Sequence, residues 1–258
     1  MNEKPLSIAE YLVKSHVNGE QFVNIEGDLK PSCFMEAYKA QDYFQKLISR
    51  GDLGGYKIAL SSKIQQEFHK INQPVFGGIF EKEIYKSPKK IKLSDYQRLS
   101  VEFELAFQLS KKIEYLTLGK DPSNIKDYIS NVYPALELIE DRKAEYKGLD
   151  ALSLACDNAW SGGLIIGKKL KNWRDLDFMN LTSNCKWNSE PLKSTSVMDA
   201  DPFNNLFWII NKLTEAKKPL TRNMLIITGS VFKVRQAKLG DKIKHIILEN
   251  PAVEVEII

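Results

Sequence analysis

The seven residues 101–107, VEFELAF, have the alternation expected of a β-strand with two different faces. Successive side chains of a strand point to opposite sides. One face therefore carries four apolar side chains, Val101, Phe103, Leu105 and Phe107. The other face carries Glu102, Glu104 and Ala106. Carboxylates two residues apart on a strand have Cα atoms roughly 7 Å apart, so the two glutamates can repel each other or share a cation.

Two interpretations of this acidic face are open. If the face meets solvent, the two glutamates are an ordinary pair of surface charges. If it lines a cavity, two carboxylates need a cation, and oxygen ligands suit Mg²⁺, Ca²⁺ or Mn²⁺. The apolar stripe favours the second interpretation because it already supplies the core contact of the strand.

A second acid-bearing strand follows at residues 133–142, YPALELIEDR. Its Glu137 shares a face with Ala135 and Ile139, and a lone buried carboxylate is costly unless it is paired or binds a metal. Together with Glu102 and Glu104, it can complete a set of three carboxylates. The alternative is an ion pair with one of the two cations that follow, Arg142 and Lys143.

Lys57 stands out in the apolar stretch 54–60, GGYKIAL. Such a lysine is usually an edge residue whose stem lies on apolar surface while its ammonium reaches water. A lysine beside a cavity can instead bind a substrate carboxylate or move protons. The three histidines show no mutual spacing typical of a ligand set, and each is expected to be a surface or helix residue: His16, His69 and His245.

The composition is that of a globular protein with a substantial core, with 258 residues of which 43% are hydrophobic and 27% charged. The net charge of +4 is spread along the chain, and no nucleic-acid-binding motif accompanies it. The three cysteines lack a CxxC pairing, which argues against a disulfide framework or zinc site and fits a reducing cytoplasm. The sequence shows neither an apolar signal-peptide core nor a membrane-spanning run. We expect a cytoplasmic protein.

The expected secondary structure changes from helical to β-rich near residue 54. Residues 1–53 are predicted to be a helical N-terminal region, with amphipathic segments at 7–19 and 31–51. Residues 54–258 are predicted to be a β-rich domain with helical insertions at 149–159 and 203–217. The β-like runs are 55–60, 101–109, 132–141, 163–167, 224–232, 242–248 and 253–258. The expected fold class is α+β.

Six segments in this order and spacing resemble one family. They are GYKIALSSKIQQ (55–66), NQPVFGGIF (72–80), VEFELAF, YPALELIEDR, DNAWSGGLIIG (157–167) and LIITGSVF (225–232). The series resembles the 2-oxopent-4-enoate hydratases and the related 2-oxo-3-hexenedioate decarboxylases of the fumarylacetoacetate hydrolase superfamily. The resemblance runs from about residue 5 to the C-terminus. The ExE strand, the PALE segment and the GYKI lysine are specific in combination, whereas each alone is weak.

This resemblance implies a small helical N-terminal region and a mixed, β-barrel-like C-terminal domain. It implies Mg²⁺ or Mn²⁺ held by Glu102, Glu104 and Glu137, and it places Lys57 in the active site. Positions that match the family's substrate-contacting motifs are Ser61, Gln73, Phe76, Ser161 and Ser230. The resemblance also implies a small 2-oxo acid substrate, a homo-oligomer, and association with a decarboxylase or hydratase of the same family.

The implied activity is that of a metal-dependent lyase. A 2-oxo or 2-hydroxydienoate substrate chelates the metal, which stabilises the enolate as a Lewis acid. Lys57 holds the substrate carboxylate or transfers a proton while the dienol becomes a ketone. Water then adds to the conjugated double bond, as in a hydratase, or a distal carboxylate leaves, as in a decarboxylase.

Two departures from the family pattern affect this expectation. Val75 stands where hydratases typically carry an acid, a natural general base for the added water. Residues 194–205, STSVMDADPFNN, replace a glycine-rich stretch. Decarboxylation or tautomerisation, a noncatalytic partner subunit, and a base supplied by Glu67 or Asp201 are therefore alternatives to plain hydration.

Overall fold

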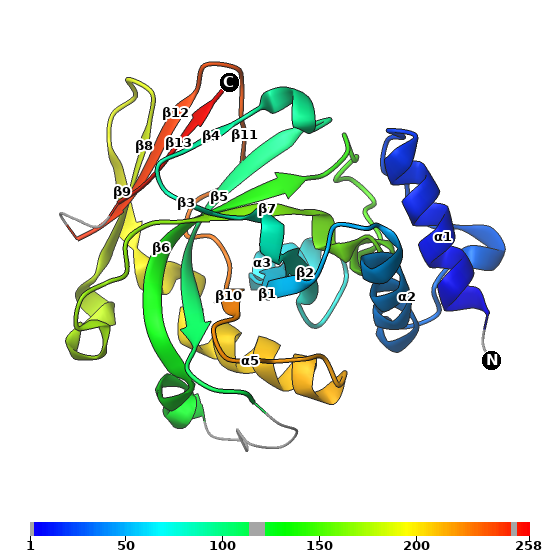
Figure 1. Cartoon of the computed structure of the whole chain (residues 1–258), viewed down its shortest axis with the longest axis horizontal. Helices are drawn as coiled ribbons and strands as arrows, with labels where there is room; N and C mark the ends of the chain where they lie inside the picture. The colour runs from blue at the N-terminus through cyan, green and yellow to red at the C-terminus, as the bar shows by residue number, and fades with distance from the viewer. Residues whose placement is uncertain (1–2, 114–121, 249–251) are drawn as a thin grey trace.

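The computed structural model describes residues 3–113, 122–248 and 252–258. Two N-terminal helices, α1 (Lys4–Val17) and α2 (Phe34–Leu47), lie together at one end of a β-rich body (Figure 1). The expected α+β class and helical N-terminal region are therefore confirmed. Helix α1 begins before the predicted Ser7, because Pro5 fits the first turn of a helix, where no backbone N–H bond is lost. No described helix is long and apolar enough to cross a bilayer.

The body contains two mixed sheets. The larger has the order β2-β1-β10-β5-β6-β7-β3, with β11 paired to β5, and the smaller has the order β4-β13-β12-β8-β9. The larger sheet comprises β1 (Leu53–Ala59), β2 (Val75–Phe80), β3 (Ile84–Lys86), β5 (Leu99–Leu109), β6 (Ile129–Glu140), β7 (Ser161–Ile166), β10 (Leu225–Ile227) and β11 (Arg235–Gln236). The smaller comprises β4 (Lys89–Ile91), β8 (Thr182–Trp187), β9 (Lys193–Ser196), β12 (Lys242–Ile247) and β13 (Ala252–Ile257).

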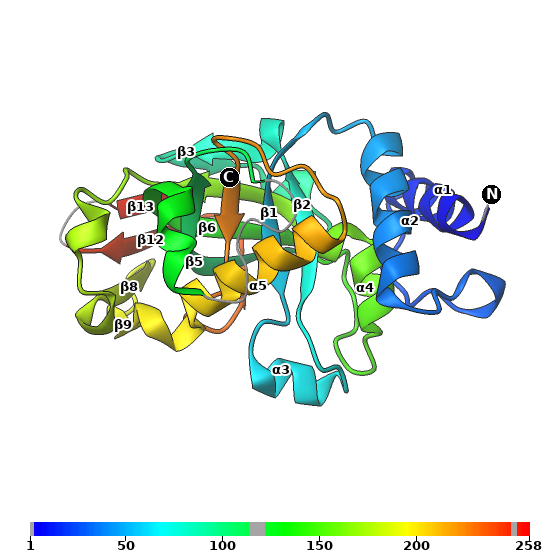
Figure 2. The same cartoon turned by 90° about the horizontal axis from the view of Figure 1, so that it is seen from below.

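The described residues form three further α-helices: α3 (Lys63–Phe68), α4 (Ala151–Cys156) and α5 (Pro202–Glu215). Helix α5 lies beside β10 in both views (Figures 1 and 2) and buries an apolar stripe against the larger sheet. Leu206, Ile209 and Leu213 on that stripe are completely buried, with the spacing of one helix face. The predicted helix at 203–217 is thus confirmed.

Each of the seven predicted β-like runs contains a strand. The run 224–232 ends early, at Ile227, because Gly229 has a φ of +107°, which is not extended backbone. The helix predicted at 149–159 is also shorter and is confined to α4, since residues 158–160 have left-handed backbone. The predicted domain boundary falls at the start of β1, yet α2 packs on β2 and α4, so it remains a prediction.

Strand β5 has the two faces expected from its sequence. Val101 and Phe103 pack in a core cluster between the two sheets, with Trp187 of β8 among their neighbours. Leu105 and Phe107 belong to the cluster beneath α5. The apolar face therefore supplies the core contacts, and the face bearing the glutamates is turned away from both clusters.

His245 is a correction to the expectation that each histidine is a surface or helix residue. It lies in strand β12 and is only 1% exposed. Its Nδ1 lies 3.0 Å from the Ala135 carbonyl, which can only accept a hydrogen bond, so Nδ1 carries the proton. Its Nε2, 2.7 Å from Ser183 Oγ, then accepts from that hydroxyl. Burial lowers the pKa of His245 to about 4.

This buried neutral imidazole predicts an acid sensitivity of folding. The pKa of His245 is lower in the folded than in the unfolded chain, so its contribution to stability is lost as the pH falls below about 6.5. Lowering the pH from about 7.5 to 5 should cost about 2 kcal/mol through this residue alone. Chemical denaturation of the wild type and His245→Gln at both pH values measures it. Equal losses in both proteins would contradict the prediction.

Candidate metal centre

The three predicted metal ligands meet on one hairpin. Strands β5 and β6 are antiparallel, and their register places Glu102 directly opposite Glu137 and Glu104 opposite Ala135. Directly opposed residues of an antiparallel pair share a face. All three glutamates therefore project to the same side, and each offers an oxygen within 4.8 Å of the others. The structure thus brings together Glu102, Glu104 and Glu137 as the sequence predicts.

The acidic face is enclosed. Glu104 and Glu137 are each 1% exposed, and Glu102 is partly exposed to solvent. The Gly229 backbone N–H donates to Glu104 Oε2 at 2.7 Å. Glu104 Oε1 and Glu137 Oε2 have no hydrogen-bond partner among the described residues. Buried carboxylate oxygens without donors are costly, so the solvent-facing interpretation of the pair is wrong.

Lys57 lies beside these carboxylates. Its side chain is 3% exposed, its ammonium forms an ion pair with Glu137, and it donates to the Ala159 carbonyl at 2.9 Å. An edge lysine that reaches water is thereby excluded. The two alternative partners of Glu137 are excluded as well, because the Arg142 guanidinium pairs with Asp157 at 2.7 Å and Lys143 is an exposed residue.

The charges of the site do not balance without a cation. Burial, and then the charge of Glu137, raise the pKa of Glu102 to about 7. Burial and the charges of Glu137 and Glu102 raise the pKa of Glu104 well above its ordinary value. If all three carboxylates are ionised, one ammonium leaves two negative charges uncompensated, and a divalent cation would offset them. The all-oxygen donor set, with unpartnered oxygens, fits Mg²⁺ or Mn²⁺.

Two of the predicted substrate-contact serines lie near this cluster. The Ser230 hydroxyl accepts a hydrogen bond from the backbone N–H of Phe103, the residue between Glu102 and Glu104 on β5. Ser61 packs against Gly229, where an added Cβ would approach Ser61 Oγ to 2.5 Å. Gly229 is thus required both by its positive φ and by this close approach. Sequence reasoning missed its N–H donor, although a glycine inside the predicted β-like run 224–232 was a usable signal of irregular backbone.

The other predicted contact residues are placed differently. Phe76 stacks on Tyr38 with ring centroids 3.8 Å apart, on the face of β2 opposite to that of Gly77. Because Gly77 is opposite Lys57, Phe76 points away from the carboxylates. Gln73 is partly exposed just before β2. The structure does not bring either residue into the cluster, and their predicted role stays a prediction.

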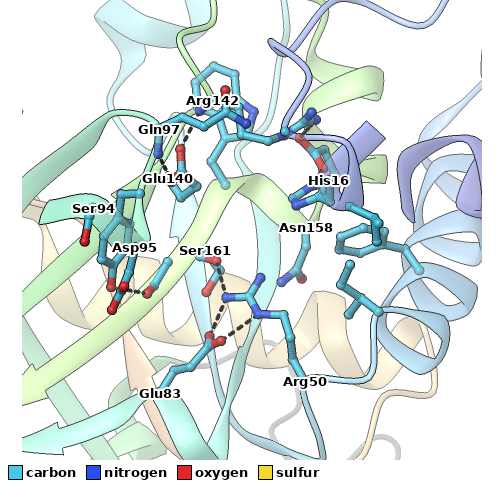
Figure 3. A pocket seen from close by; sticks show the side chains of 18 of the residues that line it. His16, Arg50, Glu83, Ser94, Asp95, Gln97, Glu140, Arg142, Asn158 and Ser161 are labelled. Carbon is cyan, nitrogen blue, oxygen red and sulfur yellow. Dashed lines mark hydrogen bonds and ion pairs between the residues drawn. The ribbon is translucent and has the colours of Figure 1, made fainter. Parts of the chain in front are cut away.

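Ser161 lines a separate cavity of about 530 Å³ (Figure 3). Arg50 spans part of this cavity, with its Nε 2.6 Å from Glu83 and its Nη2 3.1 Å from the Ser161 carbonyl. Other lining side chains include those of His16, Glu140, Arg142 and Asn158. Lys57 and the three clustered glutamates are not among the lining residues, so the cavity is distinct from the metal centre.

Position 75 faces the same side of the sheet as Lys57. The β1–β2 register sets Ala59 opposite Val75 and Lys57 opposite Gly77. Val75 lies two residues before Gly77 on β2, so its side chain points to the face that carries the Lys57 side chain. Val75 is completely buried in an apolar cluster beneath the N-terminal helices. It supplies no base there. The two alternative bases are exposed side chains, Glu67 on α3 and Asp201 before α5.

No family model matches the chain. It is 29% identical over 249 residues to the 2-oxo-hept-4-ene-1,7-dioate hydratase of Escherichia coli, covering 91% of this chain and 90% of that protein. Identity is 29% over 239 residues to the 2-keto-4-pentenoate hydratase of Paraburkholderia xenovorans, covering 90% and 87%. It is 22% over 245 residues to the 4-oxalocrotonate decarboxylase of Pseudomonas putida, covering 93% and 92%.

Solved structures share the fold. The 4-oxalocrotonate decarboxylase of Pseudomonas putida G7, complexed with magnesium and adipate, superposes with a TM-score of 0.87 at 20% identity, covering 100% of this chain and 98% of that one. The fumarylpyruvate hydrolase of Pseudomonas aeruginosa, in complex with Mn²⁺ and pyruvate, gives a TM-score of 0.54 at 11% identity, covering 79% and 88%.

Proposed function

We propose that this chain is a member of the 2-oxopent-4-enoate hydratase and 2-oxo-3-hexenedioate decarboxylase family of the fumarylacetoacetate hydrolase superfamily, and a divalent-metal-dependent lyase acting on a small 2-oxo acid. The observation that carries the proposal is the buried cluster of Glu102, Glu104 and Glu137 with Lys57 beside it. Relatives of both reaction types support the lyase class.

The residues have distinct roles in this proposal. Glu102, Glu104 and Glu137 hold Mg²⁺ or Mn²⁺, and the bound ion supplies Lewis-acid stabilisation of negative charge on the substrate's 2-oxygen. Lys57 donates a hydrogen bond to the substrate carboxylate or carries the proton that interconverts dienol and ketone. The burial of Lys57, Glu104 and Glu137 keeps bulk water from the developing charge, which strengthens both interactions.

A test of turnover separates this proposal from a noncatalytic partner subunit that retains the fold. The protein is incubated with 2-hydroxypenta-2,4-dienoate, whose loss is followed by its ultraviolet absorbance, with Mg²⁺, with Mn²⁺ and after chelation. Metal-dependent consumption supports a lyase or tautomerase. A protein that binds the ion yet consumes neither this compound nor 2-oxo-3-hexenedioate would be a binding subunit.

A second reaction within the same site is favoured by Val75. Adding water to a double bond requires a base that removes a proton from the water. A valine with no exposed surface in an apolar cluster does not provide one. Decarboxylation and tautomerisation need no base at that position, so we propose that they are better retained than hydration.

We therefore expect the wild type to form little 4-hydroxy-2-oxopentanoate from the five-carbon dienoate, with tautomerisation or decarboxylation proceeding faster. Proton NMR of the products, with Mg²⁺ or Mn²⁺ present, measures this. Val75→Asp should raise hydration by supplying the base. Val75→Asn is the matched control, since asparagine has nearly the shape of aspartate but carries no charge. Circular dichroism monitors the cost of burying a polar group there. Rapid hydration by the wild type would restore the plain hydratase assignment.

We also propose a cytoplasmic, homo-oligomeric protein that associates with a family decarboxylase or hydratase. The free cysteines support the reducing location: Cys33, Cys156 and Cys185. Light scattering on the purified chain, alone and mixed with a family decarboxylase or hydratase, tests the assembly. A monomer in both samples would contradict it.

A further inference from the structure

We propose that Asn158 is a positioning residue for Lys57, acting through a left-handed turn that aims one backbone carbonyl at the lysine ammonium. The proposal rests on the proposed catalytic role of Lys57. It adds a residue that the sequence analysis did not single out, and it gives the N-terminal helical region a part in the chemistry.

The turn itself is unusual. Asn158, Ala159 and Trp160 have consecutive φ values of 53°, 50° and 55°. Residues other than glycine rarely adopt this left-handed backbone, and a run of three is unfavourable for L-amino acids. Surrounding contacts must therefore hold it. The turn directs the Ala159 carbonyl oxygen toward the lysine, and this oxygen accepts a hydrogen bond from Lys57 Nζ at 2.9 Å.

Asn158 supplies those contacts through its side-chain amide. Its Oδ1 accepts from the Gly78 backbone N–H at 2.6 Å, and its Nδ2 donates to the Gly78 carbonyl at 2.8 Å. These two bonds attach the turn to β2, the strand that pairs with β1. Gly77 is the residue of β2 that lies opposite Lys57 in that pairing. The turn is therefore hydrogen-bonded to Gly78, the residue next to Gly77.

The turn at residues 158–160 packs closely against β2. A Cβ added at Gly77 would lie 2.3 Å from the Asn158 carbonyl oxygen. From the other side, Gln45 of α2 donates to Asn158 Oδ1 at 2.8 Å, although a buried glutamine is uncommon on a helix. Asn158 is 1% exposed and borders the cavity that also holds Arg50 (Figure 3).

The ammonium of Lys57 thus has two described neighbours that constrain it from different elements. Glu137 is also a metal ligand in the proposed site, so the Ala159 carbonyl is the contact that holds the lysine independently of the metal. If the turn relaxes, this contact is lost and the ammonium is left with the carboxylate alone. Lys57 is then misplaced for proton transfer while the three glutamates stay in position.

The test compares Asn158→Ala with Ser153→Ala. Ser153 is also buried, but its side-chain hydroxyl is hydrogen-bonded to the Ile25 backbone N–H and to Asp150 rather than to residues 158–160. The readouts are the ¹³Cε NMR signal of Lys57 in metal-free protein, assigned with Lys57→Arg, the Mg²⁺ affinity by calorimetry, and kcat and KM. Asn158→Ala should shift the Lys57 signal, lower kcat roughly 10- to 100-fold and leave Mg²⁺ affinity unchanged. Ser153→Ala should change only the free energy of unfolding.

Two further variants keep the test decisive. If Asn158→Ala does not fold, Gln45→Ala removes one of the hydrogen bonds to Asn158 and should move the same signal to a smaller extent. In the Lys57→Ala background, Asn158→Ala should lower kcat no further. A Lys57 signal unchanged in folded Asn158→Ala would overturn the positioning role. A signal that moves while kcat stays within about twofold would instead overturn the catalytic role of Lys57.

Discussion

Replacing Glu104 with glutamine is expected to weaken Mg²⁺ and Mn²⁺ binding on the order of 100-fold. The amide keeps the shape of the side chain but removes one of the negative charges that the cation neutralises. Calorimetric titration of metal-free protein measures the affinity. The fold should persist, because Glu104 is a source of repulsion in the metal-free state: burial and two neighbouring carboxylates raise its pKa.

The same variant makes a second, opposite prediction about stability. Without metal, Glu104→Gln should unfold no more easily than the wild type, since it removes a buried charge that Glu102 and Glu137 disfavour. With saturating Mg²⁺ the wild type should gain more stability than the variant, because the ion binds the folded state. Glu254→Gln, an exposed strand residue, is the control. Unchanged Mg²⁺ affinity in Glu104→Gln would show that the metal binds elsewhere.

Lys57→Ala should lose roughly 10²- to 10⁴-fold in kcat, the range associated with an acid–base group. Its side chain is 3% exposed and forms an ion pair with Glu137, a proposed metal ligand, so its loss removes a proposed proton carrier from beside the metal centre. Mg²⁺ affinity should not fall, because a positive charge is removed from beside the cation. Steady-state kinetics with the consumed substrate, together with calorimetry, separates the two effects.

Lys218→Ala is the matched control for this experiment. Lys218 is a second buried lysine, 8% exposed and ion-paired with Asp42, but it lies over the Phe76 ring on the other face of β2. Its loss should lower the free energy of unfolding while leaving kcat in place. Equal losses of kcat in both lysine variants would indicate that a general effect on folding explains Lys57→Ala. Full activity of Lys57→Ala would remove the lysine from the mechanism.

Two of the three proposed metal ligands were predictable as a pair because their signal is local. Strand alternation alone puts Glu102 and Glu104 on one side, opposite an apolar stripe that identifies the core face. The pairing of Glu102 with Glu137 is not local, since it depends on the β5–β6 register. For that reason the residues alone left Glu137 with two explanations, and the arrangement of strands decided between them.

The placements that sequence reasoning did not reach depend on pairing and on backbone conformation. Phe76 matches a family motif position, yet its face of β2 is opposite to that of the residue paired with Lys57. Asn158 gives almost no sequence signal, because a run of left-handed residues has no composition of its own beyond a tolerance for asparagine. The burial of Gln45 was not predicted, because the helical pattern was read from apolar residues alone and Gln45 is a polar residue on the buried face of α2.

The confinement of all three carboxylates to the β5–β6 hairpin has a consequence for how this architecture diversifies. In the proposed site, the metal ligands and the proton carrier come from separate segments, since Lys57 lies on β1 and its supporting turn is formed by residues 158–160. If the proposed roles hold, a substitution outside the hairpin, such as valine at position 75, would change which reaction follows substrate binding while leaving the three carboxylates in place.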